Sequence, residues 1–87
     1  MEDVSVIKLP QAITSKTIAD VYQMIEPVFS DKKAYSLTLK DVKNIDATGL
    51  QLLLSIKQTA QKQQLPLEFE MTDEVNQILQ EFGVSDW

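Results

Sequence analysis

Two pairs of residues in this chain have the side-chain types that acid–base or nucleophilic catalysis uses. Glu68 and Glu70 lie two apart on one face of an expected strand, where paired carboxylates could act on a sugar. That face is expected to be solvated, and exposed carboxylates there are common without catalysis. Ser55 and Lys57 contain the groups of a Ser–Lys dyad, but residues two apart on a helix point away from each other. Neither pair therefore predicts an active site.

Oxygen ligands for a hard cation occur together in the segment Asp41-x-x-Asn44-x-Asp46. The segment lacks the spacing of an EF-hand and its downstream bidentate glutamate. A turn with Asx hydrogen bonds is the better interpretation. Neither glycine has the neighbours of a phosphate-binding loop. The sequence therefore predicts no metal site and no cofactor.

A threonine–glycine pair, Thr48 and Gly49, stands where a single hydroxyl could act. It follows the expected strand end at Ile45 and Asp46 and opens an apolar helix, and ligands collect at the carboxyl ends of strands in open α/β sheets. Gly49 would leave the approach to the backbone unobstructed. The alternative is a capping box, in which Thr48 caps the helix and Gln51 completes the motif. The two roles are compatible, because a capping hydroxyl at a surface turn stays reachable.

Composition excludes most other chemistry. The 87 residues contain no histidine and no cysteine, and all eight basic residues are lysines. The chain thus lacks an imidazole base, a thiolate nucleophile, a cysteine zinc site and the bidentate phosphate clamp of arginine. A net charge of −5 disfavours nucleic acids and anionic membranes as partners. We expect a protein that is not an enzyme.

The length, the N-terminal start and the apolar runs of the sequence indicate the broad class of protein. Residues 1–87 are expected to form a single domain, since domains usually run to roughly 100–200 residues. The start lacks the basic and apolar regions of a signal peptide, and no apolar run approaches the roughly 20 residues that span a bilayer. We expect a cytoplasmic protein with no direct membrane insertion.

Hydrophobic periodicity predicts three strands and three helices that alternate along the chain. The strands are expected at 4–9, 35–40 and 67–71. The first helix is expected to begin at a cap on Thr14 or Ser15 and to kink or end at Pro27, and the second to span 48–63. The third is expected to begin at Thr72 or Asp73, with Gly83 as a left-handed C-cap. The apolar faces of the three helices are expected to comprise Ile18, Val21, Tyr22, Ile25 and Phe29; Leu50, Leu53, Leu54 and Ala60, with Ile56 at the margin; and Val75, Ile78, Leu79 and Phe82.

This alternation implies parallel strands joined by right-handed crossovers. The two later strands carry polar residues at every second position, including Ser36, Thr38, Glu68 and Glu70, so one face of the sheet should be solvated. The predicted fold class is therefore α/β, a one-sided β-α superhelix with a mainly parallel sheet. A doubly wound nucleotide-binding fold is disfavoured.

The stretch from Asp46 to Leu54 resembles the signature Asp-[Ser/Thr/Ala]-[Ser/Thr/Ala]-Gly-Leu-x-x-Leu-Leu of STAS domains, a family named for sulphate transporters and anti-sigma factor antagonists. Residues 35–45 resemble the family's preceding strand, of the form hydrophobic-x-Leu-x-Leu-x-x-Val-x-x-Ile. Residues 67–71 and 75–83 resemble its next strand and final helix. The resemblance covers roughly residues 4–84, and it implies the same one-sided superhelix.

The resemblance implies a regulatory function. In anti-sigma factor antagonists, a serine-kinase anti-sigma factor phosphorylates the hydroxyl two residues after the motif aspartate. The unphosphorylated form binds that kinase, and a PP2C-type phosphatase resets the switch. By motif position, the phosphate acceptor is Thr48, and the partner-binding residues are Asp46, Ala47, Thr48, Gly49 and Leu50. We expect a phosphorylatable switch for partner binding, and hence a phosphoprotein of signal transduction.

A second function stays open on the same resemblance. The compact chain is also similar to STAS proteins that serve as small cytoplasmic subunits of phospholipid-trafficking ABC transporters, and to others from chemotaxis gene clusters. In the transporter group, the same threonine position contacts the ATPase subunit without needing phosphorylation. The expected partner is therefore a serine/threonine-kinase anti-sigma factor or an ABC transporter ATPase subunit.

Overall fold

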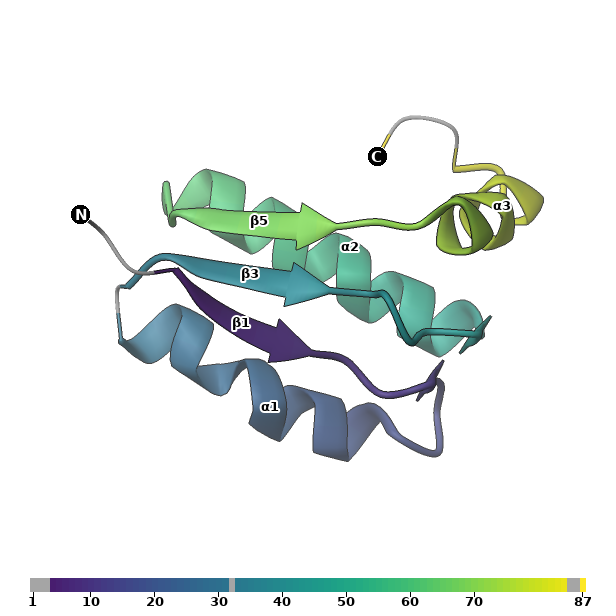
Figure 1. The fold of residues 1–87 in the computed structure, drawn as a ribbon, viewed down its shortest axis with the longest axis horizontal. Coiled ribbons are helices and arrows are strands. Elements are labelled where there is room, and N and C mark those ends of the chain that lie inside the picture. The colour runs from purple at the N-terminus through teal and green to yellow at the C-terminus, as the bar shows by residue number, and fades with distance from the viewer. Residues whose placement is uncertain (1–3, 32, 85–86) are drawn as a thin grey trace.

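The computed structural model describes residues 4–31, 33–84 and 87. Within these ranges the chain forms five strands and three helices (Figure 1). In chain order they are β1 (Ser5–Lys8), β2 (Ala12–Ile13), α1 (Ile18–Ser30), β3 (Tyr35–Thr38), β4 (Asn44–Ile45), α2 (Ala47–Lys62), β5 (Leu67–Glu70) and α3 (Asp73–Glu81).

The main sheet has three parallel strands in the order β1-β3-β5. Its register aligns Ser5, Tyr35 and Leu67 in one row across the strands. Side chains alternate between the two faces from that row onward, so Tyr35 is buried toward the core while Glu68 is exposed on the opposite face. A parallel pairing is what the alternation of strands and helices predicted.

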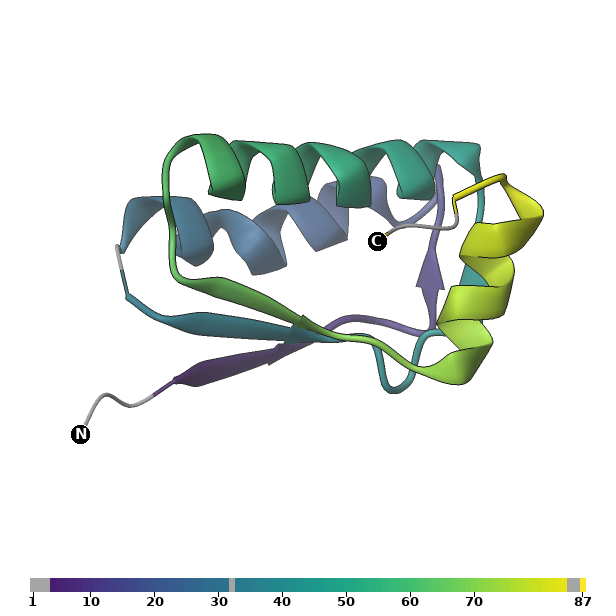
Figure 2. The same ribbon diagram turned by 90° about the horizontal axis from the view of Figure 1, so that it is seen from above.

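The helices are distributed unevenly around the sheet. Figure 2 shows α1 and α2 side by side over one face, while α3 lies across the end at which the strands finish. In the described part of the chain, no helix covers the other face. The predicted α/β fold with a one-sided β-α superhelix is therefore confirmed.

The core lies between this sheet and the two covering helices. Its side chains are almost all aliphatic, and their burial supplies the main driving force for folding. The most deeply buried are Leu9, Ile13, Val21, Ile25, Val28, Leu37, Leu39, Val42, Leu53, Val75 and Leu79. Ile56 belongs to this core as well, at 2% exposure, although the sequence placed it at the margin of the helical stripe.

The chain has two short strands that the sequence pattern did not predict. β2 pairs in parallel with β4 through Ala12 opposite Asn44 and Ile13 opposite Ile45. Each has two residues, which is too short for an alternating pattern to be recognised. This small ladder brings the connection before α1 against the connection before α2.

Helix α1 differs from the prediction at its start, and of the two outcomes expected at Pro27 it does not show an end. It begins after Thr17, whose side chain makes no cap hydrogen bond to the helix, rather than after Thr14 or Ser15. It also does not end at Pro27 but continues to Ser30, and the Pro27 carbonyl accepts a hydrogen bond from the Asp31 amide (2.9 Å). A proline removes a donor but leaves its carbonyl free to accept.

The apolar face of α1 is also rotated from the predicted one. Val28 is buried, whereas Tyr22 is 58% exposed and projects beside α2. On the sheet, Thr38 is buried rather than solvated, because β3 is the central strand and lies between β1 and β5.

The end of α3 follows the prediction. Gly83 adopts a φ of 87°, and its amide donates to the Gln80 carbonyl (2.9 Å) while the Val84 amide donates to the Leu79 carbonyl (2.9 Å). These two bonds form a Schellman motif. Among the described residues, no helix combines the length and apolarity needed to cross a bilayer.

Candidate functional site: the start of α2

The candidate site lies where the two connections held by the β2–β4 ladder meet. One connection runs from Thr14 to Thr17 before α1, and the other contains Asp46 at the start of α2. The amide of Asp46 donates to the carbonyl of Ile13 (3.4 Å), which continues the ladder to the helix. Residues about 30 positions apart in the sequence therefore form one surface.

Asp46 joins the two connections through both of its carboxylate oxygens. Oδ1 accepts a hydrogen bond from the Gly49 amide (2.8 Å), and Oδ2 accepts one from the Ser15 amide (3.0 Å). Asp46 has extended backbone angles and is the N-cap of α2, a position that favours aspartate because its side chain satisfies an unpaired amide. Asp46 thus fixes the helix start and the preceding loop together.

These hydrogen bonds lower the pKa of the Asp46 carboxyl below its ordinary value. The Ser15 amide makes the largest contribution and the Gly49 amide the next, because both stabilise the charged form. The helix dipole also favours a negative charge at this end of α2. Asp46 is therefore an ionised anchor rather than an acid that could donate a proton near neutral pH.

The loop before α1 is held in place by its own threonines. The Thr17 hydroxyl donates to the Ala12 carbonyl (2.8 Å) and accepts from the Thr14 amide (2.9 Å). The Lys16 amide donates to the Thr14 hydroxyl (3.2 Å). Thr17 therefore stabilises the loop instead of capping α1, and Ser15 is exposed on the loop surface beside Asp46.

Gly49 is required by the close approach of α2 to β2. A Cβ atom at this position would overlap the Ile13 carbonyl oxygen and would also touch the Ile13 carbonyl carbon. Only glycine lets the first turn of the helix come this near to a neighbouring backbone. The glycine in the Thr-Gly pair therefore serves the packing of α2 on β2.

Thr48 does not cap the helix, so the predicted capping box with Gln51 is wrong. Asp46 takes the cap because it is one residue before the helix start at Ala47, which puts Thr48 at the second helical position. Thr48 is exposed, and none of the hydrogen bonds between described residues uses its hydroxyl. The alcohol stands at the positive end of a helix and faces solvent.

The structure separates the five predicted partner-binding residues into two kinds. Ala47 and Thr48 are exposed and Asp46 is half-buried, whereas Gly49 and Leu50 are buried. Sequence reasoning missed Ser15, whose amide holds Asp46 from 31 positions away. No local spacing could have found it, because the contact depends on the two-residue ladder.

Comparison with known proteins identifies the family of the chain. A family model described as "Mlab, STAS domain" matches residues 1–86. The chain therefore belongs to the STAS family. Domains of this family are generally non-catalytic and mediate protein–protein interactions.

A search of solved structures finds the crystal structure of a sulfate transporter family protein from Wolinella succinogenes. It is 22% identical to this chain, with a TM-score of 0.72, and the match covers 93% of this chain and 67% of that one. At this identity the likeness shows a common fold. No curated protein matches the chain.

Proposed function

We propose that the protein is a non-catalytic regulatory switch, in which phosphorylation of Thr48 controls binding to a protein partner. The observation that carries the proposal is the exposed Thr48 side chain at the start of α2, where its hydroxyl takes no part in the hydrogen bonds of the described residues. The family resemblance supports the same residue as the acceptor. The chain would act as one cytoplasmic domain, as an antagonist of an anti-sigma factor.

Simple energetics support a switch at this position. A phosphate adds about −1.5 to −2 charges at neutral pH. The amino end of α2 would stabilise that charge by about 0.3–1 kcal/mol, so the domain need not unfold. A partner that must remove water from the dianion would lose several kcal/mol, and about 1.4 kcal/mol corresponds to tenfold in affinity. One alcohol could therefore change affinity by more than about a hundredfold.

Of the five motif residues, some would contact the partner and the others would hold the turn and the helix in place. Ala47 and Thr48 would touch the partner, because their side chains are exposed. Asp46 would hold the turn through the Ser15 and Gly49 amides, and Gly49 and Leu50 would fix the helix against the core. The partner would be a serine/threonine-kinase anti-sigma factor, with a PP2C-type phosphatase that removes the phosphate.

The direct test is phosphorylation by such a kinase with ATP, measured by intact mass. The wild-type protein and Thr48→Ser should each gain one phosphate, since both keep a hydroxyl at the helix start. Thr48→Ala should gain none, whereas the control Ser15→Ala, which loses an exposed hydroxyl on the loop beside Asp46, should still gain one. Persistent labelling of Thr48→Ala would refute the assignment.

A second candidate function is a constitutive subunit on the ATPase of an ABC transporter. It rests on the resemblance of the compact chain to STAS proteins that are small cytoplasmic subunits of such transporters, and the likeness to a Wolinella succinogenes protein of the sulfate transporter family is compatible with a role beside a transporter. Pull-downs with the cognate partner separate the two functions. A switch loses its partner with Thr48→Glu and keeps it with Thr48→Ala, whereas a packing subunit should lose some affinity with either substitution.

A further inference from the structure

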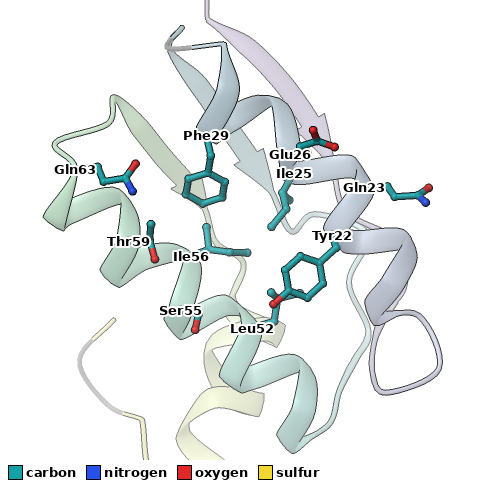
Figure 3. Close-up of a pocket in the computed structure, with 10 residues that line it drawn as sticks. All are labelled: Tyr22, Gln23, Ile25, Glu26, Phe29, Leu52, Ser55, Ile56, Thr59 and Gln63. Carbon is teal, nitrogen blue, oxygen red and sulfur yellow. The ribbon is translucent and has the colours of Figure 1, made fainter.

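An open groove of about 550 Å³ runs between α1 and α2 (Figure 3). Its floor is apolar, and the Tyr22 and Phe29 side chains reach from α1 toward α2. Its rim on the α2 side is polar but uncharged, formed by Ser55 and Thr59 of α2 and by Gln63 just after the helix. A concave apolar surface with a few polar groups is typical of a binding site.

The groove continues the surface that begins at Thr48. Residues four, seven and eleven positions further along α2 share one side of a helix with the starting residue. Counted from Thr48, these positions are Leu52, Ser55 and Thr59, and all three line the groove. A partner that contacts Thr48 can therefore extend along this side of α2 toward the groove.

The dimensions of the groove suit a helix. Its α2 wall spans residues 52–63, which corresponds to about 16 Å at about 1.5 Å per residue, or about three helical turns. Helices that dock in apolar grooves insert residues spaced i, i+4 and i+7. Tyr22, the most exposed large aromatic in the described residues, stands beside this path and could pack on such an anchor.

The negative charge at the groove favours a helix that carries basic residues. Among the described residues that line it, Glu26 is the one that carries a charge, and Asp20 and Glu26 are the two charged residues of α1. Neither lysine of α2 lines the groove, and Lys57 lies instead over the Trp87 ring, 4.8 Å from its centroid. A second copy of this chain, with a net charge of −5, is a less suitable occupant than a basic helix.

We propose that the groove between α1 and α2 binds an amphipathic helix of the partner protein, with apolar anchors on one face and lysine or arginine residues beside them. This deepens the proposed function and rests on it in taking the partner to be a protein. The anchors would fill the floor between Phe29 and Leu52, and the basic residues would meet Glu26. Thr48 would lie at the end of this helix path.

The test is selection from a phage-displayed library of helical peptides, with leucines fixed at i, i+4 and i+7 and flanking positions randomised. Unphosphorylated wild-type protein is the target. Enriched peptides should carry lysine or arginine at the flanks. The best peptide, labelled with a fluorophore, is then titrated against exposed-site variants whose fold is checked by amide NMR spectra.

The variants Tyr22→Ala and Glu26→Lys should each raise the dissociation constant about tenfold or more. Glu81→Lys on α3 makes the same charge change away from the groove and should change it less than about twofold. An equal loss with Glu81→Lys would overturn the proposal, as would enrichment of acidic or uncharged flanks or no enrichment at all.

Two further outcomes would also overturn it. If decanoate shifts the amide NMR signals of the groove residues and no peptide binds, the groove takes a small apolar ligand instead. If sedimentation shows a dimer that Tyr22→Ala dissociates, the groove is a site of self-association. The peptide assay needs no kinase and should be unaffected by Thr48→Ala. Its failure would therefore leave the phosphorylation of Thr48 to be decided by the mass measurement alone.

Discussion

At the scale of single residues, Asp46 and Thr48 have separate tasks at the start of α2. Asp46 caps the helix and holds the loop through Ser15, so its carboxylate is fully engaged by backbone amides. Thr48, two residues later, is exposed. A hydroxyl that does not cap can be modified without removing the bond that defines the helix start.

Replacing Asp46 by Asn should lower stability at neutral pH and have little effect in acid. The folded pKa of Asp46 lies below its ordinary value of 3.8, so the charge stabilises the fold above that pH. The contribution is lost as the pH falls through the folded pKa. Urea midpoints at several pH values should therefore show the gap between wild type and Asp46→Asn closing below 3.8.

The matched control for this prediction is Glu68→Gln, which removes an exposed carboxylate from β5. The Glu68→Gln substitution should change the urea midpoint little at neutral pH, because the Glu68 side chain is exposed. A constant gap between wild type and Asp46→Asn across the whole range would show that the charge of Asp46 does not contribute.

Replacing Gly49 by Ala should lower the free energy of unfolding by about 1–3 kcal/mol, although alanine favours a helix by about 1 kcal/mol. The added Cβ would overlap the Ile13 carbonyl oxygen, so α2 and β2 must separate. Denaturation and amide NMR shifts of the loop from Thr14 to Thr17 measure both effects.

Gly83→Ala is the comparison for Gly49→Ala. Gly83 has open space around it, so alanine there meets no clash. It should lower the free energy of unfolding by about 1–2 kcal/mol, because alanine disfavours the left-handed backbone at this position. The amide NMR shifts of the loop before α1 should not change in Gly83→Ala. If Gly49→Ala were as stable as wild type and left that loop unchanged, the close approach of α2 to β2 would be disproved.

Sequence reasoning at this scale found the residue exposed at the helix start but assigned the cap wrongly. The motif placed Asp46 and Thr48 at the same turn, and either side chain can cap a helix. The choice between them depends on which residue precedes the first helical one. Moving the helix start by two positions changes the cap from Asp46 to Thr48. Boundaries of elements are the least reliable part of such a prediction.

At the scale of elements, the long amphipathic segments were predictable and the short ladder was not. α2 and α3 have repeated apolar positions over two turns or more, which is a strong signal. β2 and β4 are specified by contacts between distant residues, Ala12 with Asn44 and Ile13 with Ile45. The composite surface of the site depends on this ladder, so the sequence alone could supply only its α2 half.

Pro27→Ala should stabilise the protein by about 2 kcal/mol. A proline inside a helix costs about 3 kcal/mol relative to alanine, partly offset because proline restricts the unfolded chain by about 0.4–1 kcal/mol. The new amide could donate to the Gln23 carbonyl one turn earlier. Urea denaturation measures the change, and a stability at or below that of wild type would mean that packing of the Pro27 ring outweighs the missing bond.

At the scale of the whole molecule, Trp87 covers the edge of the core between β5 and α2. Its ring makes an edge-to-face contact with Phe69, with centroids 5.1 Å apart, and the Lys57 ammonium lies over it. These contacts explain why Phe69 is only partly exposed although β5 is at an edge of the sheet.

Trp87→Ala should lower the free energy of unfolding by about 1–2 kcal/mol, less than the roughly 3–5 kcal/mol of a fully buried aromatic. Lys57→Met keeps the apolar stem and loses the cation–π contact, so it should cost about 0.5–1 kcal/mol. Trp87 is the sole tryptophan, so Trp87→Ala has no tryptophan fluorescence by which to follow unfolding. Circular dichroism is therefore used for both variants. An unchanged stability of Trp87→Ala would contradict the covering contact.

The central claim is that one accessible alcohol regulates partner binding on a domain that does not refold. The most direct measurement is the dissociation constant of the cognate partner for unmodified protein and for protein phosphorylated at Thr48. The account predicts a rise of more than about a hundredfold on phosphorylation, with Thr48→Ala binding like the unmodified protein. A difference within about threefold, well under 1 kcal/mol, would contradict it.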